Sequence, residues 1–202
     1  MPSINWRALG AGNLLGNLRS DLQKASKEVS IVGPWIDAFF AEVVIGATNS
    51  TLPIRILTRP LSSMSASFLE HATAARQRFK DRGNTEIRTL LHLHAKVILI
   101  DETIAYCGSA NWYRYSLEES AEIVLRGDCQ EVPTLLDELT SLWDQASSDD
   151  HIPTVVSSQP SVNTSEGYQD EVIDPIAAAK MAEVPKSFVL RRKTPHLGTI
   201  QK

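Results

Sequence analysis

One short segment of this chain brings together residue types that can bind and attack a phosphate group. His94 and Lys96 stand two residues apart, and Ser109 and Asn111 follow after an apolar stretch. A neutral imidazole is a nucleophile, an ammonium group is a cation, and hydroxyl and carboxamide groups donate hydrogen bonds to anionic oxygens. Together these residues predict a site for a tetrahedral anion with a nucleophile beside it.

The spacing of these residues predicts how the backbone holds them. We expect a strand over 94–100, and because side chains alternate along a strand, His94 and Lys96 would project from the same face. The next strand would end at Gly108, where the absence of a side chain lets the backbone turn and approach a ligand closely. The nucleophile, the cation and the donors would then share one pocket.

The rest of the chain alternates between helical and strand-like patterns. We expect helices over 13–27, 38–47, 62–82 and 132–145, and strands over 28–36, 52–57, 85–91, 94–100, 103–107 and 121–125. Asp37 is expected to cap the second helix, Gly83 to end the third, and Asp101-Glu102 to form a tight turn. This alternation predicts an α/β fold with a mixed β-sheet flanked by helices.

The composition changes near residue 147. Residues 1–147 predict one domain, whereas 148–202, rich in Ser, Asp, Pro, Thr and Gln, cannot bury enough surface to fold alone. Within this tail, 174–183 favours a short helix that docks on the domain or on a partner protein. No apolar run reaches the roughly 18 residues of a transmembrane helix, and the two cysteines fit no metal-ligand spacing and make no disulfide framework. We therefore expect a cytoplasmic protein.

Charge is unevenly distributed along the chain, although the formal net charge is only -4. Between Arg55 and Lys96 there are 8 basic and 3 acidic residues, whereas from Glu118 to Asp174 there are 14 acidic residues and one basic residue. A polyanionic substrate would be drawn to the basic middle of the chain. The alternative is that the bases over 76–82 form only the solvated face of a helix.

The segment from His94 to Asn111 resembles the HKD motif of the phospholipase D superfamily. It matches the pattern H-x-K-x4-D-x6-G-S-x-N at every fixed position, and Glu122 follows in an apolar stretch, where the family places a glutamate. The resemblance covers roughly residues 28–145. It implies a phospholipase D/nuclease-like sandwich fold and hydrolysis of phosphodiesters with no metal or other cofactor.

The resemblance also implies roles for individual residues. Catalytic roles fall on His94, Lys96, Ser109, Asn111 and Glu122, and structural roles on Asp101 and Gly108. His94 would attack phosphorus to give a phosphohistidine, while a second imidazole protonates the leaving oxygen. Glu122 would hydrogen-bond the nucleophilic histidine and fix its orientation.

This mechanism needs two imidazoles, but the chain carries a single such motif. Of the other histidines, none is followed two residues later by a lysine: His71, His92, His151 and His196. The simplest solution is a homodimer in which each His94 faces its twin across a two-fold axis. A non-catalytic member that keeps only the fold is the alternative.

Several residues near the motif have two interpretations. Arg59 is a candidate substrate-binding residue, as are Trp112 and Tyr113, whose rings could form a stacking platform or could simply pack behind the motif. His92 could support the site, pair with His94 in a zinc site, or stand there by accident. Trp35 is interpreted as a core residue.

Three functions remain open at this point. The first is an endonuclease of low sequence specificity acting on DNA or RNA, because small single-motif relatives include bacterial nucleases and animal nucleases attached to mitochondria. The second is a phospholipase D-type lipid phosphodiesterase. The third is a nuclease-like subunit of an anti-phage or restriction assembly, recruited through the tail.

Overall fold

The computed structural model of the chain describes residues 5–148. Its helices are α1 (Ala11–Leu22), α2 (Ala38–Ala47), α3 (Ala66–Arg82), α4 (Arg114–Glu118) and α5 (Pro133–Gln145), with 3-10 turns at Leu61–Ser63 and Cys129–Glu131. Its strands are β1 (Arg7–Leu9), β2 (Val29–Val32), β3 (Ile54–Thr58), β4 (Thr85–Thr89), β5 (Val97–Ile100), β6 (Ile104–Gly108), β7 (Val124–Asp128) and β8 (Ser147–Ser148). The expected tail helix over 174–183 lies outside the described residues, so the domain boundary at 147 stays a prediction.

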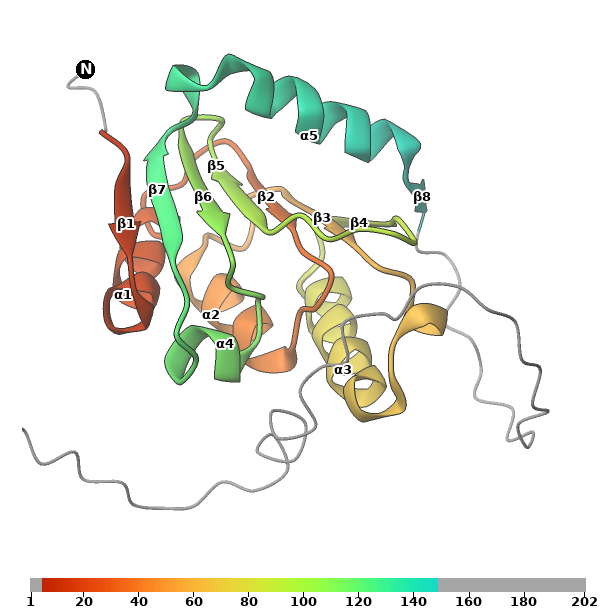
Figure 1. Cartoon of the computed structure of the whole chain (residues 1–202). Coiled ribbons are helices and arrows are strands. Elements are labelled where there is room, and N and C mark those ends of the chain that lie inside the picture. The colour runs from red at the N-terminus through yellow and green to blue at the C-terminus, as the bar shows by residue number, and fades with distance from the viewer. Residues whose placement is uncertain (1–4, 149–202) are drawn as a thin grey trace, which may run out of the picture. The chain divides into compact units, whose positions relative to one another are not determined.

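The strands form one mixed sheet in the order β1-β7-β6-β5-β2-β3-β4-β8. β2, β3 and β4 are parallel to one another, and every other pairing in the sheet is antiparallel. Helices α1 to α4 pack on one face of this sheet and α5 crosses the other, as Figure 1 shows. The predicted fold class, a mixed sheet flanked by helices, is confirmed.

Three local predictions from the sequence are also confirmed. Asp37 caps α2, because its carboxylate accepts the backbone N–H of Phe40 at 2.8 Å. Gly83 ends α3 with a φ of +71°, which a residue without a side chain adopts readily. Asp101 and Glu102 both have positive φ, and the N–H of Thr103 closes the turn between β5 and β6.

The structure departs from the sequence-based prediction around the motif. Strand β5 begins at Val97, so His94 and Lys96 lie in the segment before it and not inside the strand expected over 94–100. The reason is a turn after β4: Leu90 donates to the carbonyl of Thr58 at 2.9 Å, and Leu93 donates back to Leu90 at 3.2 Å. Strand β1 and helix α4 were not predicted.

Helix α5 covers its face of the sheet only in part. Trp143 is buried, but the other members of the expected apolar stripe are half-buried: Leu135, Leu136, Leu139 and Leu142. On strand β7, Leu125 stays 43% exposed. An apolar part of the sheet is therefore open to contact beyond α5. Among the helices of residues 5–148, none is long and apolar enough to cross a membrane.

Candidate active site

The motif residues gather at one end of the sheet, where β6 ends and β5 and β7 begin. Val97 pairs with Cys107, and Gly108 pairs with Val124, so these three strand ends are neighbours. A Cβ atom on Gly108 would lie 2.2 Å from the carbonyl oxygen of Ile123. The close approach of the segment that begins β7 therefore requires a glycine at this position.

The side chains of His94 and Lys96 meet, although no strand holds them. Lys96 Nζ lies 3.3 Å from Nε2 and 3.4 Å from Nδ1 of the His94 ring, and it donates to the His94 carbonyl at 3.1 Å. Lys96 is buried, whereas His94 is exposed. The arrangement places a shielded cation against an imidazole that solvent and substrate can reach, which suits nucleophilic attack on an anion.

Glu122 organises the second half of the motif. Its carboxylate accepts hydrogen bonds from the hydroxyls of Ser109 and Ser116, the latter at 2.6 Å. The Ser116 hydroxyl in turn accepts the backbone N–H of Asn111 at 2.9 Å. Among the described residues, Glu122 makes no hydrogen bond to His94. Glu122 instead holds the loop that carries Ser109 and Asn111, and the contact with His94 that the family resemblance implies stays a prediction.

Ser116 is the member of this site that the sequence did not predict. It is fully buried in α4 and connects Glu122 to the backbone of Asn111. The side-chain oxygen Oδ1 of Asn111 is itself buried and has no hydrogen-bond partner in the described part of the chain. Buried polar atoms without partners are rare and are often found at functional sites.

Asp101 fixes the hairpin that leads into the site. Its carboxylate accepts backbone N–H groups of Ser26, Lys27 and Glu28 at 2.8 to 3.1 Å. Partial burial by itself raises the pKa of Asp101, but the hydrogen bonds from Lys27, Ser26 and Glu28 outweigh it and lower the pKa. The side chain ties the β5–β6 turn to the segment before β2, which fits the structural role implied by the family resemblance.

The aromatic residues after the motif belong to the interior. Trp112 is fully buried, donates from Nε1 to the carbonyl of Val32 at 2.7 Å and stacks on Phe40 with ring centroids 5.5 Å apart. Tyr113 is buried against Phe68, and burial raises the pKa of its hydroxyl. The expectation that Trp112 and Tyr113 form a stacking platform for substrate is corrected, because neither ring has a face open to a ligand.

The two remaining candidates lie close to the motif in the sequence or the fold. Arg59, just after β3, is half-buried and donates from Nε to the carbonyl of Leu91 at 3.0 Å. His92 is exposed. Within residues 5–148, no group of three or more His, Cys, Asp or Glu side chains is placed to hold a metal ion. A zinc site built on His92 and His94 has no third ligand in this range.

Residues 18–143 match the sequence family described as "Cardiolipin synthase, PLD-like domain". Because the match spans more than half of the chain, the chain belongs to this phospholipase D-like family. Among curated protein sequences, none matches this chain.

Solved structures with the same fold include three bacterial proteins. NucT from Helicobacter pylori is 17% identical with a TM-score of 0.61, and the match covers 72% of this chain and 99% of NucT. Nuc from Salmonella typhimurium, a phospholipase D family member, is 16% identical with a TM-score of 0.59, covering 73% and 98%. Phosphatidylserine synthase from Haemophilus influenzae is 15% identical with a TM-score of 0.54, covering 70% and 38%. The chain thus has the fold of the phospholipase D superfamily of phosphodiesterases.

Proposed function

We propose that this chain is a metal-independent phosphodiesterase that uses His94 as its nucleophile at a homodimer interface, and that its substrate is nucleic acid cleaved with low sequence specificity. The observation that carries the proposal is the contact between Lys96 Nζ and the exposed His94 ring. It provides a nucleophile and a charge-stabilising cation at the same point of the surface.

The reaction follows from these groups. The unprotonated ring nitrogen of His94 attacks phosphorus, and the P–O bond to the leaving group breaks. A protonated His94 of the second copy gives its proton to the departing oxygen. Water then attacks the phosphohistidine, gives a proton to that same imidazole of the second copy, and releases the phosphate product with His94 restored. Lys96 stabilises the charge on the phosphoryl oxygens during both steps.

Ser109 and Asn111, which follow β6, are the remaining donors for the phosphate oxygens, and Ser109 is already hydrogen-bonded to Glu122. Ser109 donates its hydroxyl proton to Glu122 and accepts the backbone N–H of Ile123 at 3.2 Å. Its hydroxyl would have to exchange the bond to Glu122 for one to phosphate. Asn111 would supply a second donor through its amide nitrogen.

Exposed apolar residues support the dimer. Ile123, next to Glu122, is 64% exposed, and Leu125, two residues further on, also faces outward. Leu91, three residues before His94, is exposed as well. A second copy that brings its own His94 to the phosphorus atom has to approach this end of the sheet, and covering these side chains would favour its docking.

The positive charge that would attract a polyanionic substrate is confined to the region near the site. Part of the basic excess over 55–96 is neutralised by acids outside that segment, because Arg78 pairs with Glu42 and Arg55 pairs with Glu28. Lys96, whose Nζ atom lies against the His94 ring, places a positive charge at the site itself. The exposed Leu91 and Ile123 favour a second candidate, a lipid phosphodiester, since they would equally contact acyl chains. Recruitment to a larger assembly through the tail rests on residues outside those described.

The test compares two histidine variants in the presence of EDTA. A labelled single-stranded oligonucleotide and phosphatidylcholine vesicles are offered to the wild type, His94→Ala and His92→Ala. We expect oligonucleotide cleavage by the wild type and His92→Ala, and none by His94→Ala, with all three sedimenting as dimers. Release of choline without oligonucleotide cleavage would favour the lipid candidate, and metal-dependent cleavage that survives His94→Ala would rule out the proposal.

A further inference from the structure

The indole ring of Trp35 borders the nucleophile from a different part of the chain. Trp35 lies in the loop after β2, and its ring stands at 90° to the His94 imidazole with centroids 6.2 Å apart. The sequence suggested only a core residue here, and Trp35 is indeed buried. A buried ring perpendicular to an exposed imidazole limits the orientations that the imidazole can adopt.

Arg59 connects this tryptophan to the segment that carries His94. Its guanidinium carbon lies 5.7 Å from the centre of the Trp35 ring, and its Nε atom donates to the carbonyl of Leu91. Leu91 belongs to the turn immediately before His94. The Arg59 side chain therefore contacts both the Trp35 ring beside the imidazole and the backbone of the turn that precedes His94.

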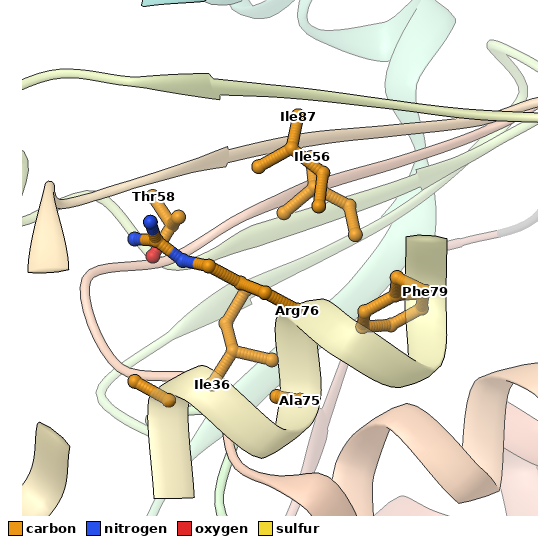
Figure 2. Close-up of a pocket in the computed structure, with 8 residues that line it drawn as sticks. Ile36, Ile56, Thr58, Ala75, Arg76, Phe79 and Ile87 are labelled. Atoms are coloured by element: carbon orange, nitrogen blue, oxygen red, sulfur yellow. The ribbon is translucent and has the colours of Figure 1, made fainter. Parts of the chain in front are cut away.

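Arg59 is itself held from below by α3. Arg76, only 6% exposed, donates a hydrogen bond to the carbonyl oxygen of Arg59. Figure 2 shows the Arg76 side chain running from α3 toward Thr58. Both residues line a cavity of about 10 Å³, which has room for roughly one water molecule. Thr58 also donates to the carbonyl of Pro34 at 3.3 Å, next to Trp35. These hydrogen bonds connect the end of β3 to the loop after β2, and the loop after β3 to α3.

We propose that Trp35 and Arg59 are positioning residues that hold the His94 imidazole in line for attack, with Arg76 fixing Arg59. The inference rests on the proposed function of His94. In this proposal Arg59 acts through its contacts with Trp35 and Leu91. Its positive charge alone would instead suggest direct binding of substrate phosphates.

The kinetic test uses two substrates of different size, a labelled oligonucleotide and bis(p-nitrophenyl) phosphate. For Trp35→Leu and Arg59→Gln we expect kcat to fall about 10- to 100-fold on both substrates while KM changes little, because a displaced nucleophile slows any diester. Trp35→Phe, which keeps an aromatic edge, should recover most of the lost rate. Arg19→Gln, at an exposed position on α1, is the charge control and should match the wild type.

Two kinetic results would overturn the proposal. If Arg59→Gln raises KM for the oligonucleotide alone and leaves the small diester unaffected, Arg59 binds substrate directly. If Trp35→Leu keeps the wild-type kcat on both substrates, the ring does not position His94.

A spectroscopic readout separates this inference from the proposed function. The Hε1 proton of His94, identified by its loss in His94→Ala, should shift in Trp35→Leu because the ring current of the indole is removed. It should broaden or shift in Arg59→Gln and stay in place in Arg19→Gln. An enzyme that turns over no diester would remove the proposed function alone, whereas an unmoved His94 resonance in Trp35→Leu would overturn the positioning role.

Discussion

The ammonium nitrogen of Lys96 lies within 3.4 Å of both ring nitrogens of His94, although neither residue is part of a strand. The cation is buried and the imidazole is exposed. In the proposed mechanism, Lys96 would stabilise the negative charge that develops when the imidazole bonds to phosphorus.

Replacing Lys96 should slow the reaction with little change in binding. We expect Lys96→Met to lower kcat about 100- to 1000-fold, the range found when one preorganised donor is removed from a transition state. Steady-state kinetics on the oligonucleotide measure this, with Lys24→Met at an exposed position as the control. A variant with wild-type kcat would show that Lys96 is only structural.

Ser116 should matter for both rate and stability. Ser116→Ala leaves Glu122 with one donor fewer and the N–H of Asn111 without its acceptor, so we expect kcat to fall about 10-fold and the free energy of unfolding to fall by about 1–3 kcal/mol. Urea unfolding and kinetics on the folded protein measure the two effects. Ser62→Ala, at an exposed serine, should change neither. A Ser116→Ala enzyme as fast as the wild type would show that Ser116, and with it α4, does not contribute to catalysis.

Asp101 predicts a pH dependence of stability. Its pKa is lowered in the folded protein, so its contribution is fully present above the ordinary value of 3.8 and is lost as the pH falls through the lowered pKa. Asp101→Asn should therefore be less stable than the wild type by about 1–3 kcal/mol at pH 7, and this difference should shrink below pH 3.8. Urea unfolding at pH 7 and at a pH below 3.8 measures this difference in stability. The control is Asp144→Asn, at an exposed position. A difference that persists unchanged in acid would contradict the charge-based account.

Ile123 should lie in the interface between two copies. Ile123→Asp places a charge on the apolar surface beside Glu122, so we expect the dimer to dissociate and the cleavage rate to fall with it. Sedimentation at several protein concentrations measures the association. Val132→Asp makes the same kind of change at an exposed residue beyond the far end of β7 and should leave the dimer intact. A stable dimer of Ile123→Asp would show that Ile123 does not lie in the dimer interface.

The sequence predicted well those features that depend on neighbouring residues. The cap at Asp37, the stop at Gly83 and the turn at Asp101 each follow from the preference of one residue type for one backbone conformation. The spacing of His94 and Lys96 predicted that their side chains project together, and the two side chains do meet, even though the strand expected to hold them begins later, at Val97.

Features that depend on distant parts of the chain were not predictable in this way. A Cβ atom on Gly33 would lie 2.3 Å from Cδ1 of Trp112, so the burial of that ring is decided by a contact across almost 80 positions of sequence. Trp35 is buried as expected but also lies beside the imidazole, and of the two interpretations of Trp112 its full burial supports packing in the core. Ser116 carries no motif, and only the fold brings it to Glu122.

The most direct test of the central claim is the activity of a purified heterodimer with one wild-type copy and one His94→Ala copy, carrying different tags. If the two imidazoles act on one phosphorus atom, this heterodimer should be at least about 100-fold slower than the wild-type dimer, because it lacks either the nucleophile or the proton donor. A heterodimer that keeps roughly half of the wild-type rate would show that each copy works alone, and would contradict the account.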